Sequence, residues 1–255
     1  MNEAPRTTVR ILDEDRAFGS VLSQEDFDVA RRFALADVHQ LGRGSYHPSE
    51  LFDRDGLLGL LVLDGLLVRQ VGLAGRRCGE IVGPGTLLRP WDDSQTSTPL
   101  PFELDWRVLQ PVRMALLDRR FLATIVRWPP LVEAFIERAS ERAHTLAFNV
   151  AIHCVQRVDL RLMLLFWHLA ERFGKVTPVG TVVPLVLSHS DLAELVGAAR
   201  PSVSTALKEL GLQGFVQRNR ADRSWLLSSD LADRLQEMTE NRARAQGVGV
   251  TEICG

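Results

Sequence analysis

The sequence predicts an α+β chain: an N-terminal antiparallel β-roll, a long helix and a C-terminal winged helix-turn-helix. Residues 41–117 consist of short apolar runs broken by glycine, proline and aspartate, as in antiparallel sheets with closely spaced turns. Residues 131–156 carry apolar residues at spacings of three and four, which indicates a helix. Residues 188–208 read SHSDLAELVGAARPSVSTALK, the pattern of two short helices joined by a glycine turn.

The bulk composition indicates a folded protein of a reducing compartment. A chain of 255 residues can bury a sizeable core and is long enough for two domains. Its 45% hydrophobic and 24% charged residues are typical of globular proteins. Only three cysteines occur, widely spaced, which argues against a disulfide framework and favours the cytoplasm. No signal peptide is visible and no apolar run is long enough to span a bilayer, so no membrane association is expected.

The first half of the chain is predicted to be a loose tail over residues 1–22 followed by the β-roll over residues 23–128. A capped helix at 23–36, with Phe27, Ala30 and Ala34 on one side, opens the roll. The apolar runs that predict its strands lie at residues 57–63, 66–71, 80–82, 106–109 and 112–117.

A long helix is predicted over residues 129–156, introduced by two prolines. A helix of this length between two domains, apolar along one stripe, usually packs against a partner helix. The alternative is packing within the same chain. We expect the dimer interface to consist of the stripe Val132, Ile136, Ala139, Ala143, Leu146 and Val150.

The helix pair at residues 188–208 carries several independent signals. Ser188 and Asp191 can cap the first helix, and Gly197 lies where the chain must turn, a position that often requires positive φ. Pro201 fits the first turn of the second helix. That helix is apolar on one face and polar on the other, which suits a DNA groove. An ordinary helical hairpin is the alternative.

A wing-like segment follows at residues 215–227, where two short strand-like runs flank a turn. Residues 200–223 contain five basic and two acidic residues, a net charge of +3, whereas the whole chain carries −2. A local basic patch is what contacts to DNA phosphates require, although three wing arginines could also be plain solvated surface. Residues 157–228 therefore predict a winged DNA-binding domain, and residues 229–255 a C-terminal helix and tail without an assigned role.

In this order of elements the chain resembles the CRP/FNR family of bacterial transcription regulators, most closely in LAELVGAARPSVSTALKEL and the wing. The resemblance implies a roll like a cyclic-nucleotide-binding domain and a homodimer that binds double-stranded DNA and acts with RNA polymerase. It also implies that Arg200 and Ser204 or Thr205 contact bases, and that Ser202 and Lys208 lie near phosphates. The wing arginines expected at the DNA are Arg218, Arg220 and Arg223.

The sequence departs from that family at the expected ligand site. Residues 90–106 contain no Arg or Lys and hold four carboxylates, Asp92, Asp93, Glu103 and Asp105, which would repel a cyclic phosphate. An arginine from elsewhere, such as Arg76 or Arg113, could replace the missing cation. Neither an iron–sulfur cysteine cluster nor a metal-ligand pair of histidines is present, so we expect no cofactor and no metal.

Two other functions are alternatives to DNA binding. An enzyme is disfavoured, because no nucleophile elbow, P-loop, dinucleotide fingerprint or clustered metal ligands occur. The stronger alternative is a dimeric sensor or protein-interaction subunit whose winged helix no longer binds DNA. The basic residues kept in the helix pair and the wing argue against it.

Overall fold

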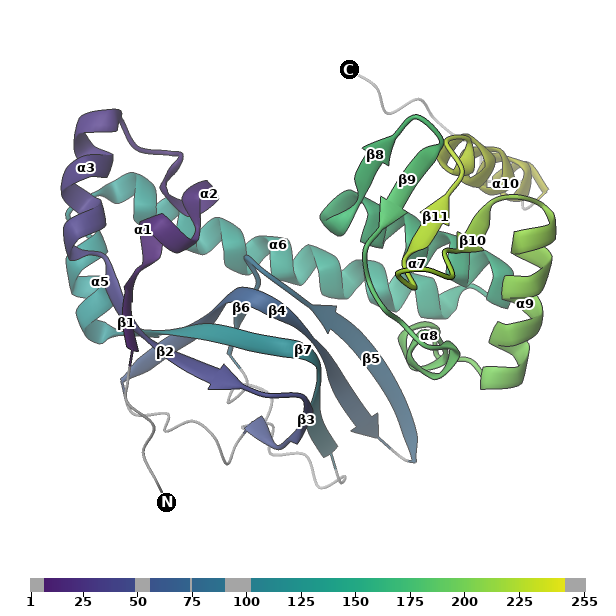
Figure 1. Cartoon of the computed structure of the whole chain (residues 1–255), viewed down its shortest axis with the longest axis horizontal. Helices are drawn as coiled ribbons and strands as arrows, with labels where there is room; N and C mark the ends of the chain where they lie inside the picture. The colour runs from purple at the N-terminus through teal and green to yellow at the C-terminus, as the bar shows by residue number, and fades with distance from the viewer. Residues whose placement is uncertain (1–6, 49–55, 74, 90–101, 246–255) are drawn as a thin grey trace. The chain divides into compact units, whose positions relative to one another are not determined.

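The computed structural model describes residues 7–48, 56–73, 75–89 and 102–245, and the chain divides into two compact units, Met1–Phe148 and Asn149–Gly255 (Figure 1). The predicted α+β class is confirmed: the first unit is built around an antiparallel sheet and the second around a helix-turn-helix. The boundary between the units falls inside the long helix.

The sheet of the first unit is antiparallel, with the strand order β1-β2-β7-β4-β5, while β3 also pairs with β7 and β6 with β4. Its strands are β1 (Thr7–Arg10), β2 (Leu35–Leu41), β3 (Gly44–Tyr46), β4 (Leu57–Leu73), β5 (Arg76–Val82), β6 (Leu87–Leu88) and β7 (Phe102–Asp118). Strand β2 is not predicted from the sequence, although Ala36 and Val38 are buried and alternate with more exposed residues.

The two long strands β4 and β7 join apolar runs that the sequence presents as separate. Register shifts between Val62 and Leu66 mark a bulge within β4, so the chain bends without leaving the sheet. Gly65 lies in this bulge with φ +89°, and a Cβ there would be 2.1 Å from the carbonyl oxygen of Pro111. Only glycine fits this close approach of two strands.

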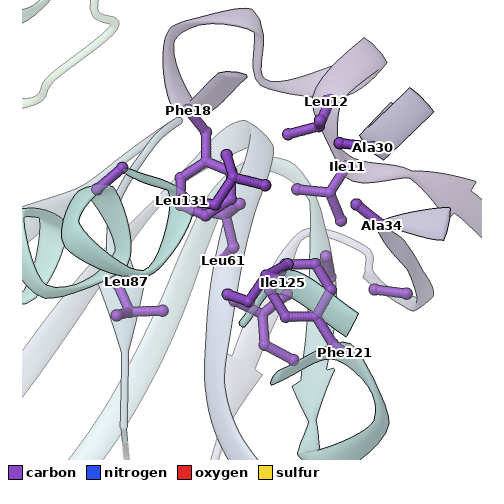
Figure 2. Close-up of a cluster of buried hydrophobic side chains, with 14 residues drawn as sticks. Ile11, Leu12, Phe18, Ala30, Ala34, Leu61, Leu87, Phe121, Ile125 and Leu131 are labelled. Atoms are coloured by element: carbon purple, nitrogen blue, oxygen red, sulfur yellow. The ribbon is translucent and has the colours of Figure 1, made fainter. Parts of the chain in front are cut away.

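The predicted N-terminal tail is wrong for residues 7–22, which belong to the first unit. After β1 come α1 (Ile11–Glu14), α2 (Arg16–Gly19) and α3 (Gln24–Phe33), and Ser23 caps α3 as predicted. Ile11 and Leu12 are fully buried in a cluster with Phe121 and Leu131, shown in Figure 2. A pair of apolar residues is too short to show the periodic pattern of a helix or strand, so the sequence does not indicate that it fills a core made by other segments.

The long helix α6 (Pro129–Cys154) follows α5 (Arg119–Ile125), and one of its faces is tied to the first unit. We call this the inner face. Leu131 is buried in the core cluster, and the Arg138 guanidinium donates to the Asp15 carboxylate at 3.0 Å. The Arg142 guanidinium donates to the buried Glu80 carboxylate at 2.8 Å. The predicted alternative of packing within the chain therefore holds for this face.

The opposite, outer face of α6 is apolar and largely uncovered within the chain. Ile136 is 59% exposed and Val150 65% exposed, and Ala139 and Ala143 are exposed as well. Two members of the predicted stripe differ from this pattern, because Leu146 is half-buried and Val132 packs against the core cluster.

The second unit surrounds α7 (Val158–Phe173) and contains a four-stranded sheet in the order β10-β11-β9-β8. Its other elements are β8 (Lys175–Thr177), β9 (Gly180–Val183), α8 (His189–Val196), α9 (Arg200–Leu212), β10 (Val216–Arg218), β11 (Trp225–Leu227) and α10 (Leu231–Ala245). Strands β8 and β9 precede the helix pair, in a segment for which no strand is predicted from the sequence. The C-terminal helix belongs to this unit, because Leu231 and Leu235 are buried and α10 contacts α7.

Candidate nucleic-acid interface

The first helix of the pair, α8, begins and ends as its sequence predicts. The Ser188 hydroxyl accepts from the Asp191 backbone N–H at 3.1 Å, and the Asp191 carboxylate accepts from the Ser188 backbone N–H at 2.6 Å. Gly197 ends the helix in the left-handed region, with φ 59° and ψ 42°. A Cβ there would be 3.0 Å from the His153 ring, so glycine serves both the turn and the packing.

The second helix, α9, has a buried face and an exposed face. Its inward residues are Val203, Ala206, Leu207 and Leu210, all buried. Its exposed polar residues are Arg200, Ser202, Thr205, Lys208 and Glu209. Four of the side chains predicted to contact DNA thus lie on one accessible helix, while the apolar residues anchor it in the unit.

Ser204, predicted as an alternative base contact, lies differently from its neighbours. It is half-buried, and its hydroxyl is 2.8 Å from Nδ1 of His189 on α8. Burial is the first cause that lowers the pKa of His189 below its usual value, followed by the positive charges of Arg218 and Arg200. The contact between Ser204 and His189 links α9 to α8. The hydroxyl of Thr205, which is exposed, is the more accessible of the two.

Two residues that sequence analysis missed hold the turn in place. The Arg161 guanidinium on α7 donates to the carbonyl oxygens of Val196 at 3.0 Å and Gly197 at 3.2 Å. His153 Nε2 lies 3.0 Å from the carbonyl oxygen of Leu195. The last carbonyl oxygens of any helix have no hydrogen-bond donor within the helix. A basic residue that donates to them is therefore expected, but the sequence does not indicate where along the chain it lies.

The wing consists of β10, β11 and the turn between them. The Asn219 side chain accepts from the Ala221 N–H at 3.0 Å, and the Asp222 carboxylate accepts from the N–H and hydroxyl of Ser224. The two bonds from Ser224, the hydroxyl first, lower the pKa of Asp222 below its usual value. Arg220 and Arg223 are exposed on this turn.

Arg218 differs from the other two wing arginines. Its guanidinium carbon lies 5.3 Å from the centroid of the Trp225 ring, a cation–π geometry. Its Nη2 is buried and has no hydrogen-bond partner among the described residues. Trp225 is buried against Phe166, with ring centroids 5.0 Å apart. The sequence does not distinguish these arginines, because the difference depends on a tryptophan seven residues further along.

A pocket of about 330 Å³ lies between α9 and the wing. It is lined by His189, Ser204, Leu207, Lys208, Gly211, Val216, Gln217, Arg218 and Trp225. Three of these side chains are basic and none is a carboxylate, so the pocket continues the positive charge of the exposed face of α9.

The expected ligand region of the roll is only partly described, since residues 90–101, with Asp92 and Asp93, lie outside the described residues, as does the Arg76 side chain. Glu103 accepts from Arg77 at 2.8 Å, and Asp105 lies 2.5 Å from His47. Arg113 donates to both Glu14 and Asp64.

Within the part of the chain that is described, no helix is both long and apolar enough to cross a bilayer. The same residues contain no group of three or more histidine, cysteine or carboxylate side chains placed to hold a metal ion.

Residues 160–238 match the model of the Crp-like helix-turn-helix domain, which spans α7 to the first half of α10. Similar solved structures include a CooA mutant from Carboxydothermus hydrogenoformans, at 19% identity over 83% of this chain and 90% of that one, with a TM-score of 0.60. A cyclic nucleotide-binding domain containing protein from Listeria monocytogenes has 15% identity over 85% of this chain and 97% of that one, with a TM-score of 0.60. FixK2 from Bradyrhizobium japonicum has 17% identity over 79% of this chain and 96% of that one, with a TM-score of 0.56. No curated protein matches the sequence.

Proposed function

Because the chain carries a Crp-like helix-turn-helix domain on the fold of CRP/FNR-type regulators, we propose that it is a homodimeric, sequence-specific DNA-binding regulator of transcription. The observation that carries this proposal is the exposed face of α9. Arg200, Ser202, Thr205 and Lys208 all reach solvent from one helix whose apolar residues are buried. A rigidly seated helix with a polar outer face is what the major groove accepts.

The proposed roles follow from where each side chain lies. Arg200 in the first turn of α9 contacts base edges, and so does Thr205, five residues further along. Ser202 and Lys208 contact phosphates on either side of the groove. Arg220 and Arg223 on the wing contact the adjacent backbone, where their charge adds affinity without sequence information.

The outer face of α6 is proposed as the dimer interface. Ile136, Ala139, Ala143 and Val150 are exposed and apolar, and the inner face of the same helix is already occupied by contacts within the first unit. A second copy offers the same stripe, so the two helices can pair about a two-fold axis. Such a dimer binds a nearly palindromic site with half-site centres about one helical turn of DNA apart.

The wider proposal is a cytoplasmic regulator that acts with RNA polymerase, is not an enzyme, and does not use cyclic AMP through the usual family contacts. The composition of the ligand region supports the last point, because residues 90–106 hold four carboxylates and no Arg or Lys, and Arg113 is paired with Glu14 and Asp64. An effector, if the roll takes one, is expected to be apolar or cationic.

Paired substitutions on α9 test the DNA proposal. We expect Arg200→Ala to weaken binding to the operator by about 5- to 150-fold, because a base contact contributes roughly 1–3 kcal/mol of discrimination, and to weaken binding to unrelated DNA less. Lys208→Ala should weaken both and flatten the dependence on salt. The measurement is a fluorescence-anisotropy titration over several salt concentrations, with operators taken from genomic footprints.

Arg127→Ala is the matched control, since it removes the same charge from the first unit, outside the helix-turn-helix. Equal losses on operator and unrelated DNA for Arg200→Ala would remove that residue from the base-contacting role. If the wild-type protein binds no genomic fragment at all, the alternative of a dimeric sensor without DNA binding replaces this proposal.

A further inference from the structure

The end of α8 is held by side chains that lie outside the helix-turn-helix. The N–H groups of the turn donate back to the carbonyl oxygens of Ala193 and Glu194. The next three carbonyl oxygens, those of residues 195–197, accept instead from His153 and Arg161. A carbonyl oxygen can only accept, so His153 Nε2 is the donor in its contact. The end of α8 is therefore positioned by two side chains from elsewhere in the chain.

These two donors flank the junction between α6 and α7. His153 is in the last turn of α6, and Arg161 is near the start of α7. The Arg161 guanidinium also donates through Nε to the carbonyl oxygen of Val155, in the link between the two helices. One side chain thus joins this link, the start of α7 and the end of α8. We call Arg161 and His153 together the clasp.

The clasp lies directly against the turn that leads into α9. A Cβ at Gly197 would be 3.0 Å from Nδ1 of His153, so the last turn of α6 packs closely on this turn. Helix α7 is itself fixed, because Leu162 and Phe166 are buried. Helix α9 begins at Arg200, directly after the turn. The direction in which α9 leaves the turn therefore depends on the clasp.

The same part of α6 carries one end of the proposed dimer interface. Val150 on the outer face is 65% exposed, and it belongs to the second unit together with His153 and Arg161. Within this one compact unit, the clasp connects the helix that meets the second copy to the helix that meets DNA. Any change in the clasp would change the direction of α9 relative to the end of α6.

That direction matters for a dimer on DNA, because each base pair between two half-sites moves them by about 3.4 Å and rotates them by roughly 35°. Two rigidly held recognition helices fit one spacing, whereas two loosely held helices fit several. We propose that Arg161, supported by His153, is the positioning residue that sets the half-site spacing of the operator. This consequence rests on the proposed DNA-binding function, but the clasp can be measured without DNA.

An arginine suits this place for two reasons. Its positive charge is favourable at the C-terminal end of a helix, where the carbonyl oxygens concentrate negative charge. Its planar guanidinium also presents several donors in fixed directions, so Arg161 can hold the carbonyl oxygens of two segments at once. A lysine keeps the charge but loses this fixed geometry. Arg161→Lys therefore separates the positioning role from the electrostatic one.

A distance measurement in the full-length protein tests the clasp without DNA. Spin labels are attached to Ala151→Cys on α6 and Glu209→Cys on α9, both exposed positions, after the three native cysteines are replaced by serine. Labelled protein is diluted with unlabelled protein, so that only the distance within one chain contributes to double electron–electron resonance. We expect one narrow distance distribution, which broadens or shifts in Arg161→Gln and, to a smaller extent, in Arg161→Lys.

Arg157→Gln is the matched control. Arg157 lies in the same link, but its side chain is exposed and pairs with Asp159 rather than with the end of α8. This variant should keep the wild-type distance distribution. A wild-type distribution in both Arg161→Gln and His153→Phe would overturn the proposal.

Operators that differ only in half-site spacing then measure the consequence for DNA binding. The wild-type protein should bind its preferred spacing about tenfold more tightly than an operator with one inserted base pair, and Arg161→Gln should reduce this ratio to about threefold or less. The base preference within each half-site should stay that of the wild type, in contrast to Arg200→Ala.

An equal loss of affinity at every spacing in Arg161→Gln would mean that the clasp only stabilises the unit, and would overturn the proposal. If the wild-type protein binds no DNA, the proposed function fails, and the distance distributions still decide whether Arg161 positions α9.

Discussion

Replacement of Ile136 by alanine measures what the outer face of α6 contributes to assembly. Ile136 is 59% exposed within one chain, and that exposed share is what a second copy can cover. Full burial of an isoleucine side chain stabilises by about 1.5–3 kcal/mol, so the remaining share is worth about 1–2 kcal/mol. Alanine keeps one carbon of the side chain, which leaves a loss of about 1 kcal/mol per protomer. A symmetric dimer carries the change twice, and about 2 kcal/mol raises the dissociation constant roughly 30-fold.

Sedimentation equilibrium over a wide concentration range measures that constant directly. The fold of the single chain should not suffer, because the residue is exposed there and alanine has the higher helix propensity. Val126→Ala is the control, since Val126 is 53% exposed at the end of α5, outside the stripe, and should leave the dissociation constant unchanged. A wild-type protein that is monomeric at micromolar concentration, or an Ile136→Ala variant with the wild-type constant, would refute the argument.

Three further predictions concern the fold and the roll. In a urea titration, Gly65→Ala should lower the free energy of unfolding by roughly 2–4 kcal/mol, because the new Cβ would clash with the Pro111 carbonyl and the residue has a positive φ. Gly56→Ala is the control, since Gly56 has the same φ but open space around it, and it should lower the free energy of unfolding by less. Burial, followed by Arg172, lowers the pKa of His168 to about 4, below its unfolded value. As pH falls, His168 is therefore protonated in the unfolded chain before it is protonated in the folded chain. The free energy of unfolding should fall by about 1–2 kcal/mol between pH 6.5 and pH 4, and it should fall by less in the His168→Phe variant. Calorimetry at millimolar cyclic AMP or cyclic GMP should detect no saturable binding, whereas binding lost on Arg113→Ala or Arg76→Ala would mean that the site uses a different arginine.

The helix-turn-helix, whose residues match the Crp-like domain, can be recognised in the sequence because its signals are local. The cap at Ser188, the turn at Gly197 and the proline at 201 each act within a few residues of themselves. The N-terminal segment gave no such signal. Ile11 and Leu12 belong to a buried cluster that also includes residues more than a hundred positions away, such as Phe121 and Leu131, and only the folded chain brings these together.

The candidate site divides in the same way. Exposure of Arg200 and Lys208 follows from helical periodicity, which a sequence displays. The engagement of Ser204 by His189, the stacking of Arg218 on Trp225 and the support of the turn by Arg161 depend on side chains from other elements. No spacing rule along one segment encodes such contacts.

The ties of α6 to the roll determine where this protein can be cut or recombined. A chimaera joined at residue 129, the predicted boundary, would separate Glu80 from Arg142 and Asp15 from Arg138, and would strip Leu131 from the core cluster. Each orphaned carboxylate would then be left among groups arranged for a guanidinium. An exchange that keeps residues 7–148 together preserves those pairs, so a transplanted roll should carry most of its helix with it.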